Sequence, residues 1–345
     1  MTEPVAIEGR ELRIGNWPSR VLGASGFMPV WLVAAALMLV ASVLAPQTLS
    51  GTAFSEIWPF MTFLAVASLG QMLVVMTGGI DLSVPGVITM VGTVLLGVSQ
   101  AQDDRMVWAM VVCIALAAGV GLVNGALVGL VGLNPLIVTL ATGQIVIGLT
   151  ATYRVGIAQE ARVPPAIASW TADRVLGVSH AWWLGIAITV VVAIVVSRTR
   201  AGRRLQLVGA NREAAFVAGI PVRRTTVSAY VGAGVLYGTA GLLLAAFIRS
   251  PTLDVGAPYL LGPIAVAVVA GAALSGGVAS ALSTWVAAFA LTFLATMLRV
   301  MGLPSALQFI VFGVAIAVGM VISGDRIVGI VGHLTTSRQR AANRA

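Results

Sequence analysis

Asp81 is the only charged residue between Glu56 and Asp103, and it lies in the run T-G-G-I-D-L-S at 77–83. A carboxylate at the centre of a bilayer costs roughly 2.5–3.5 kcal/mol, so this chain must shelter the charge or use it. Because two glycines break a helix here, Asp81 can cap the next helix at the cytoplasmic edge, accepting hydrogen bonds from the N–H groups that follow. The functional alternative is a helix break that lines a translocation path or a gate, where irregular backbone borders water or protein.

An arginine-rich segment, 198–225, is the second candidate, since it carries seven arginines against one acid. Within it, Asn211 is a good N-cap for two helical turns over 212–218, and Gly219 can end them. A capped helix too short to span a bilayer suits docking against another protein. The alternative is a solvated loop whose arginines only set the membrane topology. The helix would expose Ala214, Ala215 and Phe216.

Four amide side chains in apolar stretches could contact a polar solute along a substrate path. In a glycine-rich span such as 121–129, the usual role of an amide is an interhelical hydrogen bond. A place on the path is the alternative for each, because a binding site needs few polar side chains. The four residues are Gln71, Asn124, Gln144 and Gln308.

The composition predicts an all-α polytopic membrane protein that positions these residues. Of the 345 residues, 59% are hydrophobic and 9% charged, whereas soluble domains are about 25% charged. Two of the apolar ranges, 261–275 and 278–299, are separated by Gly-Gly and could be partial or re-entrant. The ten expected spans are 27–45, 58–76, 83–100, 107–131, 134–152, 181–197, 226–248, 261–275, 278–299 and 303–323.

The residue types exclude several kinds of active site. The chain has no lysine and a single cysteine, Cys113. A P-loop needs a lysine on the nucleotide phosphates, and a Schiff-base enzyme needs a lysine amine. The sequence also lacks H-E-x-x-H, G-x-S-x-G and any Cys–His arrangement. We therefore expect no enzyme activity, no cofactor or metal in this chain, and no nucleic-acid partner.

The positive-inside rule places the arginine-rich segment in the cytoplasm. Counting ten spans outward from it puts both termini in the cytoplasm, which gives an N-terminal segment 1–26, a transmembrane domain 27–323 and a C-terminal tail 324–345. The runs 77–79 and 275–277 each separate two apolar spans on the cytoplasmic side, which would fit a parallel internal pseudo-repeat. The helix-break or gate hypothesis then comprises Gly78, Gly79, Asp81, Gly276 and Gly277.

Together these runs resemble the permease subunit of ribose-type (monosaccharide) ABC importers, the inner-membrane component of binding-protein-dependent transport. Four stretches carry the resemblance, in the family's order and spacing: GGIDLS at 78–83, GLVNG at 121–125 with NPLIVTLAT at 134–142, GANREAAFVAGI at 209–220, and the final span 308–322. One stretch departs from the family pattern G-G-T-S-L-x-G-G-x-G-S, because 270–280 reads A-G-A-A-L-S-G-G-V-A-S. This puts any hydroxyl-dependent role there in doubt and suggests one half of a permease heterodimer.

The resemblance implies a bacterial inner-membrane permease that moves a monosaccharide or sugar-like solute by alternating access. It implies a separate ATP-binding subunit that holds ATP and Mg, a second permease in a homodimer or heterodimer, and a periplasmic or lipid-anchored sugar-binding protein, all within membrane lipid. The alternative is a secondary transporter or uniporter without an ATPase partner. His180 and His333 lie outside the expected spans, which disfavours proton coupling. The implied coupling helix, which contacts the ATPase, comprises Asn211, Arg212, Glu213, Ala214, Ala215 and Gly219.

Overall fold

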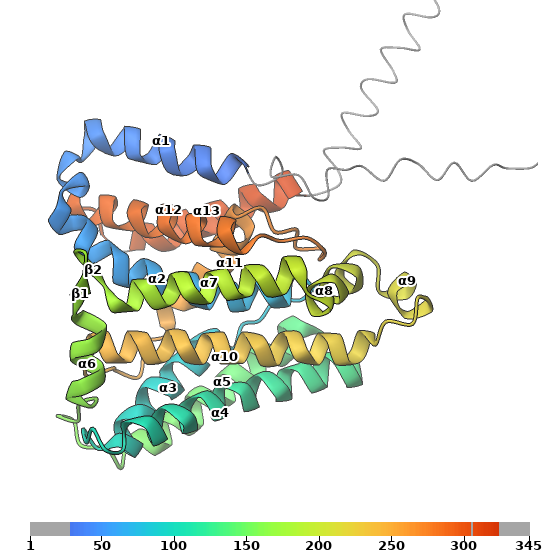
Figure 1. Cartoon of the computed structure of the whole chain (residues 1–345), viewed down its shortest axis with the longest axis horizontal. Helices are drawn as coiled ribbons and strands as arrows, with labels where there is room; N and C mark the ends of the chain where they lie inside the picture. Colours follow the sequence, from blue (N-terminus) through green and yellow to red (C-terminus); the bar gives the residue numbers. More distant parts are fainter. Residues whose placement is uncertain (1–27, 305, 324–345) are drawn as a thin grey trace, which may run out of the picture.

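The chain folds into a bundle of helices that run side by side (Figure 1). The computed structural model describes residues 28–304 and 306–323, so the predicted cytoplasmic segments 1–26 and 324–345 lie outside the described residues. The elements are α1 (Met28–Leu44), η3 (Pro46–Leu49), α2 (Gly51–Val75), α3 (Val84–Ser99), α4 (Met106–Ala126), the π-helical turn η4 (Leu127–Val131), α5 (Pro135–Arg154), α6 (Pro165–Ala172), β1 (Arg174–Val175), β2 (Val178–Ser179), α7 (His180–Arg198), α8 (Arg200–Ala210), α9 (Arg212–Val217), α10 (Val222–Ile248), η5 (Ala257–Tyr259), α11 (Gly262–Val269), α12 (Ala281–Val300) and α13 (Ala306–Ser323).

Within the described residues, six helices are long and apolar enough to cross a membrane: α2, α4 with η4, α5, α7, α10 and α12. They confirm a polytopic helical membrane protein. Three further apolar helical segments are shorter, namely those at 30–44, 84–99 and 257–269. Of the two ranges predicted as possible partial spans, 278–299 holds the 20-residue α12. The other holds α11, whose 8 residues make a helix about 12 Å long, too short to cross a bilayer.

Among the membrane-length helices, α2, α10 and α12 are mostly buried, while α4, α5 and α7 expose much of their apolar surface. The shorter α3 and α11 are also mostly buried. Small residues bring the helix backbones together. A methyl group at Gly121 of α4 would overlap the Tyr230 carbonyl oxygen of α10, and one at Gly234 would overlap the Ala117 carbonyl oxygen. Such close approach is how helices pack in lipid, where apolar burial gives no driving force between them.

The two ends of the bundle carry different structures (Figure 1). At one end lie α6 and the antiparallel pair β1–β2, in which Arg174 pairs with Ser179. At the opposite end lie α8 and α9, connected to the first end through α7 and α10. Segment 153–180, which contains α6 and the β1–β2 pair, and the arginine-rich segment 198–225 are therefore at opposite ends of the molecule.

Candidate functional site

The break between α2 and α3 is an ordered, buried structure. Gly78 has a φ of +79°, in the left-handed region that favours glycine, and a methyl group there would lie 3.2 Å from the Ser275 carbonyl oxygen. The Asp81 side chain is 1% exposed. Its Oδ1 accepts hydrogen bonds from the Ser83 N–H at 2.8 Å and the Ser83 hydroxyl at 2.6 Å. Asn124 of α4 donates from Nδ2 to the Ser83 hydroxyl oxygen at 2.9 Å, which ties the break to a third helix.

Neighbouring helices also satisfy the irregular backbone at Asp81. With its amide oriented so that both ends are satisfied, Gln71 donates from Nε2 to the Asp81 carbonyl oxygen at 3.0 Å and accepts from the Asp81 N–H at 3.1 Å. The same nitrogen donates to the Tyr237 hydroxyl oxygen at 3.1 Å. On the other side, Thr139 of α5 accepts from the Leu82 N–H at 2.9 Å. Side chains from α2, α4, α5 and α10 therefore hold one short segment.

Asp81 acts as a local cap, and it does so from a buried position. It does accept from the Ser83 N–H, as expected, but Ser83 itself occupies the N-cap position of α3. The physical reason is packing. Side chains of α2, α4 and α5 close over the segment, so Asp81 is held by Ser83 and lies 1% exposed.

Two buried polar atoms beside this network have no hydrogen-bond partner within the described chain: Asn124 Oδ1 and the Tyr230 hydroxyl. Tyr230 packs on the break itself, because a methyl group at Gly79 would lie 2.6 Å from the Tyr230 hydroxyl oxygen. Buried polar groups are normally paired.

A glycine junction, which we define as Gly78, Gly209, Gly276 and Gly277, joins the break to the arginine-rich segment. The Gly277 N–H donates to the Met76 carbonyl oxygen at 3.0 Å. A methyl group at Gly276 would lie 2.8 Å from the Gly209 carbonyl oxygen and 3.0 Å from the Gly78 nitrogen, and one at Gly209 would overlap the Met76 carbonyl oxygen. The end of α2, the end of α8 and the segment before α12 therefore touch backbone to backbone.

The short helix predicted after Asn211 is present as α9 and is capped at both ends. The Asn211 Oδ1 accepts from the Ala214 N–H at 2.9 Å. At the other end, Gly219 has a φ of +75°, its N–H donates to the Phe216 carbonyl oxygen at 3.0 Å, and the Ile220 N–H donates to the Ala215 carbonyl oxygen at 3.0 Å. This pair of bonds is a Schellman motif, which fixes the end of the helix.

Ala215 corrects one detail of the docking hypothesis. It was expected on the exposed face, but it is buried at 4% exposure, whereas Phe216 is 73% exposed and Val217 is 86% exposed. The Schellman motif explains the difference, because the hydrophobic contact that accompanies it joins the C″ residue, Ile220, to the C3 residue, Ala215. The exposed face of α9 therefore comprises Glu213, Ala214, Phe216 and Val217.

A cleft of about 220 Å³ lies on the other side of the break, between α3, α5 and the segment before η5. Its polar lining includes Thr89, Gln144 and Asp254, and Leu82 and Pro85 of the break border it. The Gly256 N–H donates to the Thr89 hydroxyl oxygen at 3.2 Å, so this segment turns back against the first turns of α3. Of the four predicted path residues, Gln144 is the one that lines this cleft.

Comparison with known proteins identifies the family to which this chain belongs. Residues 53–320 match the family described as "Branched-chain amino acid transport system / permease component". The chain belongs to this permease family. With its membrane-length helices, the permease is a multi-pass protein of the bacterial inner membrane. No solved structure matches the chain.

Several curated relatives of the permease align over most of both chains. The probable ABC transporter permease protein y4mJ of Sinorhizobium fredii is 32% identical and covers 83% of this chain and 85% of its own. The L-arabinose ABC transporter permease protein AraH of Azospirillum brasilense is 29% identical, with 89% of each chain covered. The ribose import permease protein RbsC of Escherichia coli K12 is 28% identical and covers 89% of this chain and 98% of its own.

Within the permease, the structure brings some predicted site residues together and separates others. All five helix-break residues lie in one region, and Gln71 and Asn124 make hydrogen bonds within that region. The side chain of Gln308 lies outside the described residues. Gly209 is a junction residue that was not singled out from the sequence, although the 209–220 run contained it. The contact between Gly209 and Gly276 depends on chain packing, which sequence spacing does not contain.

Proposed function

We propose that this permease imports a monosaccharide or sugar-like solute by alternating access, driven by a separate ATP-binding subunit. The ribose and L-arabinose named for its relatives support the choice of solute class. The absence of lysine supports a partner that hydrolyses ATP, because a P-loop needs that residue. A second permease and an external sugar-binding protein complete the proposed assembly, and ATP and Mg belong to the partner subunit.

The glycine junction is the observation that carries the mechanism. α9 follows directly after α8, and Gly209 in the last turn of α8 touches the backbone of Met76 and Gly276. A partner that displaces the exposed face of α9 would move α8, and no side chain at the junction could absorb the motion. The displacement would therefore reach the break at Asp81 and the start of α3. Packed backbone of this kind shifts between discrete arrangements more readily than it deforms continuously.

The cleft beside the break supplies half of the proposed path. Thr89, Gln144 and Asp254 offer hydroxyl, amide and carboxylate groups, the kinds of partner that a sugar hydroxyl needs. Gln144 is exposed on α5. A second permease that places its own copy of this face opposite would enclose the solute between two sets of polar groups. Movement of Leu82 and Pro85 would then open the cleft toward the cytoplasm.

The proposed orientation places α8, α9 and both termini in the cytoplasm, with ten membrane segments in total. The six membrane-length helices, α13 and the shorter α1, α3 and α11 make up this number, with α11 as a re-entrant segment. The seven arginines of segment 198–225 support this orientation by the positive-inside rule. The two Gly-Gly segments that meet at the junction support a parallel pseudo-repeat.

Uptake by reconstituted vesicles tests this proposal. The permease, purified together with the subunits that accompany it, is placed in vesicles with its binding protein, and uptake of radiolabelled ribose, arabinose and leucine is measured. ATP-dependent uptake of a monosaccharide is the expected result. Uptake of leucine alone would assign the solute class named in the family description, and uptake independent of ATP would favour the uniporter.

A further inference from the structure

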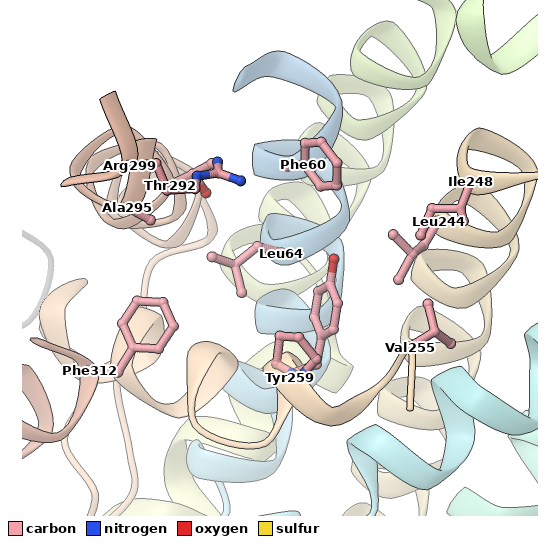
Figure 2. A pocket seen from close by; sticks show the side chains of 11 residues that line it. Phe60, Leu64, Leu244, Ile248, Val255, Tyr259, Thr292, Ala295, Arg299 and Phe312 are labelled. Atoms are coloured by element: carbon pink, nitrogen blue, oxygen red, sulfur yellow. The ribbon is translucent and has the colours of Figure 1, made fainter. Parts of the chain in front are cut away.

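A pocket of about 260 Å³, which we call the outer pocket, lies between α2, α10, α12 and α13 (Figure 2). Its walls are mainly apolar. The space is surrounded by the rings of Phe60 and Phe312 and by the side chains of Leu64 and Leu244. Tyr259 of η5 lies at its base. Its lining includes Ile248, the last residue of α10, so the pocket lies toward the end of the bundle opposite to α9. Neither the helix break nor the cleft shares a lining residue with it.

Among the described residues, Arg299 is the one charged residue that lines the outer pocket. Its side chain extends from α12 toward α2 across the space in Figure 2. A guanidinium has five N–H donors. Within the described part of the chain, the Arg299 guanidinium donates one hydrogen bond, from Nη2 to the Thr296 hydroxyl oxygen at 3.1 Å. The Arg299 side chain is exposed, and among the described residues no carboxylate contributes to the lining of the pocket.

The position of Arg299 along the helix sets its depth. It lies one residue before Val300, the last residue of α12, at the end of the bundle opposite to α9. In the proposed orientation, on which this step rests, that level is the boundary between the inner membrane and water on its external side. Long basic side chains direct their charge to this boundary, where the phosphate groups of lipids lie.

We propose that the outer pocket binds an anionic phospholipid of the outer leaflet. The lipid phosphate accepts hydrogen bonds from Arg299, and one acyl chain lies against Phe60, Leu64 and Phe312. Both parts of the pocket then have a complement: an anion for the unpaired cation, and an apolar chain for the apolar walls. The bound chain joins α12 and α13 to α2 and α10 in the outer half of the membrane domain.

A sugar fits the outer pocket less well than a lipid. Each hydroxyl of a monosaccharide needs a hydrogen-bond partner once it leaves water. The pocket offers Thr292, Tyr259 and Arg299 among walls that are otherwise apolar. A free inorganic anion would satisfy Arg299 and leave those walls unoccupied. An amphiphile with an anionic head satisfies the whole lining.

Lipid retention by the full-length permease tests the proposal, independently of transport. The protein is purified in detergent, incubated with phosphatidylglycerol or phosphatidylcholine, and analysed by native mass spectrometry. Phosphatidylglycerol should be retained in preference to phosphatidylcholine. Arg299→Gln should reduce that preference about fivefold, the effect of one basic side chain near a lipid surface. Ala295→Phe, which fills the pocket, should remove one retained lipid of either kind.

Arg249→Gln is the matched control. Arg249 is exposed at the end of α10, and it does not line the pocket, so this change should leave the preference intact. Equal losses for the Arg299 and Arg249 variants would overturn the proposal, because they would indicate attraction to surface charge alone. Retention of phosphatidylglycerol that is unaffected by both Arg299→Gln and Ala295→Phe would also overturn it. So would retention of ribose in place of lipid, which would assign the pocket to the solute.

Discussion

Gly209→Ala tests the glycine junction at the point where the arginine-rich segment meets the break. The added methyl would overlap the Met76 carbonyl oxygen and the Gly277 nitrogen, which are backbone atoms that cannot rotate away. Overpacking of this kind costs about 1–3 kcal/mol, and loss of the hydrogen bond from Gly277 to Met76 adds about 0.5–1.5 kcal/mol. Alanine in place of glycine stabilises a helix by about 1 kcal/mol, which offsets part of this cost. The net loss of stability is then roughly 0.5–3.5 kcal/mol.

Gly119→Ala is the control, because Gly119 lies within α4 and an added methyl there would meet nothing within 4 Å. It should stabilise the protein by up to about 1 kcal/mol. The assay is equilibrium unfolding in mixed detergent micelles, combined with the ratio of transport to ATP hydrolysis in vesicles. Gly209→Ala should lower both stability and that ratio, while Gly119→Ala lowers neither. If the two variants behaved alike, the close backbone contact at Gly209 would not exist as described.

Three further changes address the break and α9. Asp81→Asn keeps an oxygen that can accept from Ser83, so uptake should stay within about threefold of the unchanged protein, whereas Asp81→Ala should lower the free energy of unfolding in micelles by about 1.5–3 kcal/mol. Loss of uptake in Asp81→Asn, with folding and ATPase activity intact, would assign Asp81 a direct role. Asn211→Ala removes the cap of α9 and should cost about 1 kcal/mol, with Asn211→Ser close to neutral, as measured by amide exchange of α9. Replacing Glu213 with Arg and Ala214 with Trp should uncouple ATP hydrolysis from uptake without loss of membrane insertion, and unchanged coupling in vesicles would contradict the docking role.

Local chemistry allowed much of the site to be predicted. The helix break depends on the backbone conformation of the Gly78–Gly79 pair, and the ends of α9 depend on capping by the residues from Asn211 to Gly219. Both effects act within a few residues of the chain. The helix break and α9 therefore appear where the sequence places them. The membrane-length helices follow from apolar runs of sufficient length.

Contacts between distant segments were beyond prediction for physical reasons. Whether Gln71 faces a path or the Asp81 backbone depends on how α2 packs against its neighbours, which composition does not specify. The burial of Asp81 depends on the neighbouring helices that pack around it, and that of Ala215 depends on how the chain turns after α9. The junction at Gly209 requires three segments to converge, and the sequence does not indicate that the segment containing Gly209 meets the other two.

Hydrogen exchange of the assembled transporter tests most directly whether α8, α9 and the break move as one unit. Exchange is measured by mass spectrometry with and without a non-hydrolysable ATP analogue bound to the ATPase subunit. The predicted result is a joint change at 205–219, 76–83 and 274–278, including the Gly277 amide that binds the Met76 carbonyl oxygen. Changes confined to 205–219, with 76–83 and 274–278 unaltered, would contradict the proposed coupling.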